Sequence, residues 1–209
     1  MSIIENKVVV IVRIPVPKFV PKWLVRKKMK ATVDLYSSID GLEFKLFTLE
    51  SESGDFGGIY TWRDSASAEK WFNPEWFARV KRERGNEAHV RYFESPLSID
   101  NVQGGTPASM GGSCVATLVQ IQIPKGVSRE LVLDGFANAE ETYRNIGGLL
   151  RKHFILGSHG TFGGVYLWDS KASAQMWFND QWRERVTETY GNPPTVEWFE
   201  VPIVLPATK

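Results

Sequence analysis

Two lysines occur at matching places in two strand-like segments of the sequence. Lys45 begins the triplet Lys-Leu-Phe and Lys152 begins Lys-His-Phe, so each stands two residues before a phenylalanine, Phe47 or Phe154. Side chains two residues apart share one face of a strand, which places each lysine on an apolar face. An amine in such a place has a lowered pKa unless a carboxylate lies beside it, and it then acts as a base or holds a phenolate.

Two structural interpretations of these lysines stay open at this point. Glu94 and Glu200 recur on the final strand-like segments, and ion pairs with them would make both lysines structural. Alternatively, the amines reach water at the ends of extended side chains. The catalytic interpretation predicts that Lys152→Met abolishes ligand binding, whereas the structural ones predict a loss of stability alone.

A tyrosine and a tryptophan also recur on one strand face in each half of the chain. The pairs are Tyr60 with Trp62 and Tyr166 with Trp168. An indole offers a flat, electron-rich wall and one N–H donor, and a neighbouring phenol suits a phenolic ligand. We therefore take these four residues, together with Phe154, as candidate substrate-binding residues. Plain packing in the core is the alternative.

A histidine distinguishes the second half from the first. His153 follows Lys152 and so points to the opposite strand face, and its counterpart in the first half is Leu46. Its presence in one half alone makes His153 a candidate catalytic base beside Lys152 and Lys45, although a lone histidine is commonly a satisfied structural residue. If only one pocket has stayed active, this asymmetry favours the second half.

The remaining reactive side chains form no familiar catalytic or metal-binding pattern. The three histidines, His89, His153 and His159, are dispersed, and the sequence has no H-E-x-x-H motif and no G-x-S-x-G elbow. The only cysteine, Cys114, excludes an internal disulfide and a cysteine-rich metal cluster. We therefore predict neither a metal nor a cofactor.

The composition is that of an ordinary globular protein. The 209 residues are 43% hydrophobic and 23% charged, with a formal net charge of +1, so no strong field attracts nucleic acid or an anionic membrane. The apolar run 8–12 is too short to span a bilayer. These features predict a cytoplasmic protein without nucleic-acid or membrane partners. A basic segment over 22–30 is either a solvated face or the wall of an anion-preferring first pocket.

An internal repeat organises the chain. Residues 54–100 align with residues 160–206 without a gap, and 21 of these 47 positions are identical. Between the copies lies a glycine-rich segment of linker composition. We therefore predict a first unit over 1–100, a linker over 101–113 and a second unit over 114–209.

Each unit shows the same order of expected elements. Apolar, β-branched runs predict strands over 7–14 and 115–123, and helical spacing predicts helices over 20–37 and 128–145. Two short strands over 42–49 and 58–62, a broken helix and a last strand follow, with their twins in the second unit. The expected helix caps and strand ends are Asp64, Ser170, Asn73, Asn179, Gly85, Gly191, Pro96 and Pro202.

This order, β-α-β-β-α-β, is that of the ferredoxin-like fold, an α+β class with an antiparallel sheet and helices on one face. The other face of such a sheet needs cover. Two units in one chain can cover each other, so we expect an intramolecular dimeric α/β barrel. Whether this pseudo-dimer forms a further homodimer is left open.

The repeated motifs are Gly-Gly-Ile/Val-Tyr-x-Trp, Ala-Ser-Ala-x-x-Trp-Phe, Trp-x-x-Arg-Val and Phe-Glu-x-Pro. In these the chain resembles the YdhR-like monooxygenases of the dimeric α/β barrel superfamily, which are related to antibiotic-biosynthesis monooxygenases. The resemblance implies cofactor-independent oxidation of an aromatic or quinol-like small molecule by dioxygen, with the tryptophan of the third strand lining the pocket. A non-catalytic carrier of an aromatic metabolite on the same fold is the alternative, and a pure interaction domain is a third.

The resemblance also bears on haem. Haem-degrading members of the superfamily carry an axial histidine on the helix after the third strand. At that place this chain has Trp71 and Phe72 in one unit and Trp177 and Phe178 in the other. The departure argues against haem ligation.

Overall fold

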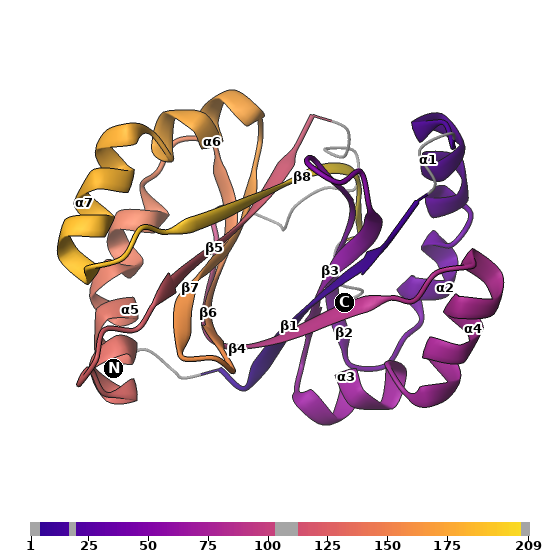
Figure 1. Ribbon diagram of the computed structural model, residues 1–209, viewed down its shortest axis with the longest axis horizontal. Helices are drawn as coiled ribbons and strands as arrows, with labels where there is room; N and C mark the ends of the chain where they lie inside the picture. The colour runs from indigo at the N-terminus through magenta and orange to yellow at the C-terminus, as the bar shows by residue number, and fades with distance from the viewer. Residues whose placement is uncertain (1–4, 17–19, 103–112, 206–209) are drawn as a thin grey trace.

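A closed barrel of eight antiparallel strands forms the centre of the molecule (Figure 1). The computed structural model describes residues 5–16, 20–102 and 113–205, so most of the predicted linker lies outside the described residues. The order around the barrel is β1-β3-β2-β8-β5-β7-β6-β4. The strands are β1 (Lys7–Ile14), β2 (Leu42–Glu50), β3 (Phe56–Trp62), β4 (His89–Asp100), β5 (Val115–Gln122), β6 (Leu149–Gly157), β7 (Thr161–Trp168) and β8 (Thr195–Leu205).

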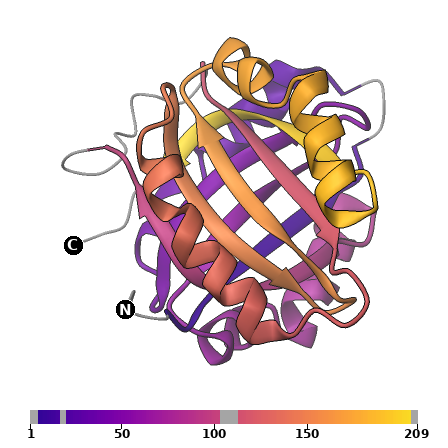
Figure 2. The ribbon, with the colours of Figure 1, turned by 90° about the vertical axis from the view of Figure 1, so that its left-hand side faces the viewer.

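The helices cover the barrel from two opposite sides. Those of the first unit lie on one side and those of the second on the other (Figures 1 and 2). They are α1 (Lys22–Lys30), α2 (Val33–Ser37), α3 (Ser65–Trp71), α4 (Pro74–Arg84), α5 (Arg129–Arg144), α6 (Lys171–Trp177) and α7 (Asp180–Tyr190). The α+β class and the predicted element order of both halves are confirmed. Within the described ranges, no helix has the length and apolar character needed to cross a membrane.

The single helix expected over 20–37 is instead two helices, α1 and α2. The chain turns at Thr32, whose hydroxyl and backbone N–H both donate to the carbonyl of Met29, at 2.8 and 3.0 Å. A threonine side chain that bonds to nearby backbone competes with the helical ladder, which explains the break. The break directs Tyr36 of α2 back over the sheet.

The predicted helix caps are confirmed in both units. The Asp64 carboxylate accepts from the Ser67 N–H at 2.7 Å, and the Asn73 side chain accepts from the Trp76 N–H at 2.9 Å. Helix α4 then ends at Gly85, whose φ of 76° favours glycine. The second unit repeats the pattern at Ser170, Asn179 and Gly191. The caps at Asn73 and Gly85 fix the start and end of α4, which forms one wall of the site described below.

The prediction that the last strands stop at Pro96 and Pro202 is wrong. Strand β4 pairs with β1 as far as Ser95, passes through Pro96 and continues beside β6 to Asp100. Its register against β6 shifts between Glu94 and Leu97. Proline lacks the N–H that a ladder needs, but a bulge leaves that position unpaired and so tolerates it. Strand β8 does the same across β5 and β2, and these two crossing strands close the barrel.

The two faces of each strand have different surroundings. The barrel interior holds an apolar cluster to which both units contribute, for example Val9, Ile59, Leu118 and Val165. The outer face of each half-sheet packs against its own helices in separate clusters. Any reactive side chain on the outer face of a strand therefore lies between the sheet and the helices.

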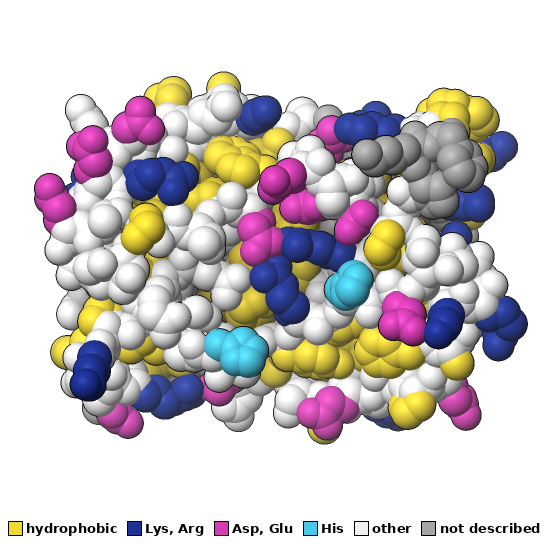
Figure 3. Space-filling view, viewed as in Figure 1, with side chains coloured by type: hydrophobic (Ala, Val, Ile, Leu, Met, Phe, Trp, Pro, Cys, Tyr) yellow, Lys and Arg dark blue, Asp and Glu magenta, His cyan; other side chains and the backbone are white. Residues whose placement is uncertain are grey.

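Equivalent residues of the two halves meet each other across the barrel. Arg91 is the third residue of β4, and Glu197 is the third residue of β8. The two form a bidentate ion pair whose shortest distance, from Nη2 to Oε2, is 2.8 Å. Arg13 also binds Glu197. Phe44 and Arg151, likewise equivalent, meet with the guanidinium 4.1 Å from the ring centroid. Figure 3 shows side chains of both charges gathered near the middle of the molecule, above the strands.

Candidate functional site

The amine of Lys45 lies inside an aromatic cage on the outer face of β2. Its Nζ is 2.8 Å from the ring centroid of Tyr36, 4.0 Å from that of Phe47 and 4.4 Å from that of Tyr60. Only 1% of the residue is exposed. The strand alternation read from the sequence places Lys45 and Phe47 side by side, and α2 supplies the third ring.

The second unit builds the same cage around Lys152. Its Nζ lies 2.9 Å from the ring centroid of Tyr143, 3.7 Å from that of Phe154 and 4.8 Å from that of Tyr166. Lys152 is likewise buried. The lysine and its rings are therefore a repeated feature of the fold.

The two structural interpretations of the lysines are wrong. Glu94 binds Arg129, and Glu200 binds Lys22 and Arg26. Neither buried lysine reaches water, and no ion pair joins either amine to a carboxylate within the described residues. Burial without such a partner lowers the pKa of both lysines well below the usual value.

The tyrosines of the cage respond to burial in the opposite direction. Burial raises the pKa of Tyr60 well above its usual value, and the neighbouring Tyr36 raises it further. Burial also raises the pKa of Tyr36, although interactions with Tyr60 and with the cations of Arg79 and Arg84 lower it. The lowered pKa of the lysine favours a neutral amine, and the raised pKa values of the tyrosines favour neutral phenols. A neutral amine is the form in which a general base accepts a proton.

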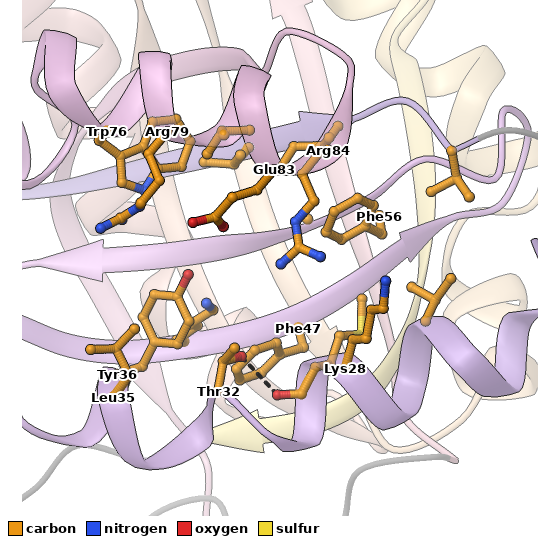
Figure 4. A pocket seen from close by; sticks show the side chains of 18 of the residues that line it. Lys28, Thr32, Leu35, Tyr36, Phe47, Phe56, Trp76, Arg79, Glu83 and Arg84 are labelled. Atoms are coloured by element: carbon orange, nitrogen blue, oxygen red, sulfur yellow. Dashed lines mark hydrogen bonds between the residues drawn. The ribbon is translucent and has the colours of Figure 1, made fainter.

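A cavity of about 430 Å³ opens beside Lys45, between β1–β3 and helices α1, α2 and α4. Figure 4 shows Tyr36, Phe47 and Phe56 around it, with Trp76 on α4. Cavities of roughly 300–1,000 Å³ with mostly apolar walls and a few polar groups hold small molecules. We call this space the α1–α4 cavity.

Two additional rings stand at the corresponding positions of the second unit. Phe136 stands where the first unit has Met29, and it lies 6.3 Å from Phe162 between ring centroids. Tyr190 stands where the first unit has Arg84, and it lies 5.0 Å from Phe162. The described cavity beside a caged lysine is in the first half, whereas the sequence favoured the second half as the active one; that preference stays a prediction.

The two strand tryptophans lie deeper than expected. Trp62 and Trp168 are fully buried behind Tyr60 and Tyr166, with near-parallel ring pairs at 6.3 and 6.0 Å. Trp62 does not line the α1–α4 cavity, whereas Tyr60 does. The indole N–H of Trp168 donates to Thr117 at 3.3 Å. Both tryptophans thus support the cage from behind.

The repeated glycine doublets make room for this arrangement. A Cβ on Gly57 would lie 1.8 Å from the carbonyl oxygen of Val12, so the neighbouring strand requires glycine. A Cβ on Gly58 would lie 3.2 Å from Cε of Lys45 and 3.0 Å from the Tyr60 ring. Each doublet therefore allows the neighbouring strand and the caged lysine to pack closely against it.

His153 lies on the opposite strand face, inside one end of the barrel. Its Nδ1 is 3.2 Å from the Ser95 hydroxyl and its Nε2 is 3.1 Å from the Thr61 hydroxyl, and all three residues are buried. Burial, with Arg151 and Lys7 nearby, lowers the pKa of His153 to about 3. The structure does not bring His153 together with the lysine cages. Both ring nitrogens of the neutral imidazole have a hydroxyl partner, so its hydrogen-bonding capacity is satisfied within the barrel.

Several cavity residues were missed from the sequence. Met29 and Tyr36 lie seven residues apart on the face of α1 and α2 that covers the sheet, and Trp76 and Arg79 lie on the covering face of α4. Helical spacing indicates the face but not whether a space remains beneath it. The available signals were differences between twin residues, such as Arg84 against a tyrosine and Met29 against a phenylalanine. Across the described ranges, no group of three or more His, Cys, Asp or Glu side chains is arranged to hold a metal ion.

Comparison with known proteins supports the fold class. A "Putative monooxygenase" from Fusobacterium nucleatum superposes with a TM-score of 0.68 at 11% identity, covering 99% of this chain and 96% of that one. An "anthrone oxidase-like protein" superposes with a TM-score of 0.64 at 15% identity, covering 98% of this chain and 94% of that one. A ferredoxin fold protein from Listeria monocytogenes, related to antibiotic biosynthesis monooxygenases, superposes with a TM-score of 0.53 at 11% identity. The superposition covers 95% of this chain and 96% of that one.

No family model and no curated protein matches the sequence. At these identities the structural similarity shows the fold alone. The chain thus has the ferredoxin-like barrel fold seen in monooxygenase-like proteins, as the sequence resemblance implied.

Proposed function

We propose that the protein is a cofactor-independent monooxygenase that oxidises an aromatic or quinol-like small molecule in the α1–α4 cavity. The observation that carries the proposal is the buried, unpaired Lys45 amine at the wall of an aromatic cavity. The fold shared with monooxygenase-like proteins agrees with it. We further infer that the two halves arose by duplication, with the site kept open in the first.

The proposed chemistry begins with proton transfer to Lys45. The neutral amine takes a proton from an acidic C–H or O–H of the bound ring system, and the resulting ammonium is stabilised by the faces of Tyr36, Phe47 and Tyr60. The electron-rich carbanion or phenolate passes one electron to dioxygen, and the substrate radical and superoxide combine to form a peroxide. Loss of water from the peroxide leaves a carbonyl, so one oxygen atom enters the product and the other leaves in water.

The direct test uses anthrone in buffer equilibrated with isotopically labelled dioxygen. With the protein, anthrone should yield anthraquinone that has gained one labelled oxygen atom and lost two hydrogen atoms, measured by mass spectrometry. The rate must exceed that of the buffer and of heat-denatured protein. A panel of anthrones, naphthols and hydroquinones recovered bound but chemically unchanged would contradict the oxygenase and support a carrier.

Filling the cavity should abolish binding without unfolding the protein. Met29→Phe with Arg84→Tyr copies the second unit, where Phe136 and Tyr190 occupy these places. We expect affinity for 1-naphthol to fall at least about tenfold, a change of 1.4 kcal/mol, while the melting temperature stays close to that of the wild type. Isothermal titration calorimetry measures the first quantity.

The matched control for the filled cavity is Phe136→Met in the second unit. This change removes a packed ring and should cost stability, about 1–3 kcal/mol, but should leave naphthol affinity unchanged. The site assignment is wrong if Phe136→Met weakens naphthol binding and the Met29→Phe, Arg84→Tyr double variant does not.

A further inference from the structure

Three basic side chains stand around the mouth of the α1–α4 cavity. Lys28 comes from α1 on one wall, and Arg79 and Arg84 come from α4 on the facing wall (Figure 4). The floor between them is aromatic, with Phe47 and Phe56. The cavity thus combines an apolar interior with a positively charged rim.

These three cations are unpaired, unlike several neighbours on the same helices. Lys22 and Arg26 of α1 both bind Glu200, whereas within the described ranges none of the three rim cations forms an ion pair or a side-chain hydrogen bond. The rim has one acid, Glu83, which also forms no ion pair there. The rim therefore keeps a net positive charge with free donors.

Two of the three rim cations are found in the first unit alone. In the second unit, the twin of Lys28 is Gly135 and the twin of Arg84 is Tyr190. Only the third cation is kept, as Arg185. Basic residues of α1 and α4 away from the cavity differ between the units as well, for example Lys27 and its twin Asp134, so the inference depends on where Lys28 and Arg84 lie in the cavity.

Arg84 lies beside the aromatic floor of the cavity. It is half-buried, and its guanidinium carbon lies 5.5 Å from the centroid of the Phe56 ring. A guanidinium presents its N–H donors in its own plane, and a planar carboxylate accepts two of them. The amine of Lys28 supplies a second charge from the opposite wall.

We propose that the α1–α4 cavity selects an aromatic carboxylic acid, whose rings lie on Phe47, Phe56 and Tyr60 and whose carboxylate lies between Arg84 and Lys28. This assignment rests on the proposed function in placing the ligand in this cavity, but it does not depend on oxidation. It assigns the substrate class: an acidic polycyclic or naphthalene-type ring system rather than a neutral phenol.

The test compares two ligands of nearly equal shape, 1-naphthoate and the neutral 1-naphthamide, by isothermal titration calorimetry on the whole protein. Naphthoate should bind about 10- to 100-fold more tightly, the range for a hydrogen bond to a charged group. Arg84→Met should remove most of that preference while naphthamide affinity changes little. Lys27→Met and Arg82→Met, on the same two helices but away from the cavity, should leave the preference intact.

The outcomes separate this inference from the proposed function. Equal binding of naphthoate and naphthamide, with anthrone still oxidised, overturns the acid preference and leaves the oxygenase in place. Selective naphthoate binding that Arg84→Met abolishes, with no compound oxidised, supports the acid site and overturns the oxygenase. If Arg82→Met weakens naphthoate as much as Arg84→Met does, the preference comes from general surface charge and the proposed site is wrong.

Discussion

Replacement of Lys45 by methionine should reduce turnover of anthrone by about 10²–10⁴-fold, the usual contribution of a general base. Methionine keeps the length and apolar contacts of the side chain within the cage of Tyr36, Phe47 and Tyr60 but has no basic nitrogen. Ligand affinity should change little, because the cavity walls are preserved. The measurement is steady-state oxidation with the bound fraction determined separately.

Lys152→Met is the control for this prediction. The second cage has the same rings but no described cavity beside it, so turnover should stay near the wild-type value. This differs from the expectation drawn from the sequence alone, in which Lys152 carried ligand binding. Equal loss in both variants would contradict a catalytic role that belongs to Lys45.

The pH dependence gives a further readout of the Lys45 prediction. Burial lowers the pKa of Lys45 in the folded protein, so kcat/KM should fall as the pH drops through that lowered pKa and the amine becomes protonated. The unfolded chain binds the proton up to its ordinary pKa, so the buried amine costs stability at neutral pH. Lys45→Met should therefore raise the free energy of unfolding at pH 7, and this gain should shrink as the pH approaches 10.5.

The second large effect concerns acid sensitivity and His153. Its pKa is about 3 in the folded protein and 6.5 in the reference state. Because the unfolded chain takes up the proton first, the stability that neutral His153 contributes is present above pH 6.5 and is lost as the pH falls toward 3. At 1.36 kcal/mol for each pH unit, the loss approaches about 5 kcal/mol.

A triple variant isolates this contribution from that of the carboxylates. His153→Leu, Thr61→Leu and Ser95→Val copy the equivalent positions, where the chain has Leu46, Leu167 and Val201 packed in the barrel interior. Replacing the whole hydrogen-bonded set avoids leaving one member unsatisfied. Urea unfolding from pH 7 to pH 3 should show wild-type stability falling more steeply than that of the variant. Parallel curves would contradict the assignment of His153 as a buried neutral group.

Much of the fold follows from local patterns in the sequence. The caps at Asp64 and Asn73 and the glycine end at Gly85 were readable because each depends on neighbouring residues alone. The alternation that put Lys45 and Phe47 on one face was equally local. The strand end at Pro96 was predicted wrongly, because only the pairing of β4 with a strand of the other unit supplies the bulge that accommodates proline.

The candidate site was less predictable for the same physical reason. The lysine cage needs Tyr36, which reaches the sheet only because the helix breaks at Thr32. Whether a cavity remains depends on differences in side-chain volume, as between Met29 and Phe136, that periodicity does not measure. Sequence reasoning therefore found the buried amines but favoured the second unit, whereas the described cavity lies in the first.

The ion pair between Arg91 and Glu197 bears on how the two halves depend on each other. These residues hold equivalent positions and face one another. A barrel built from two copies of the first half would set Arg91 against Arg91, and one built from two copies of the second would oppose two glutamates. At this contact each half carries the charge that complements the other half, so the two halves are not interchangeable. Because the halves differ in this way, evolution can alter one cavity without the same change appearing in the other.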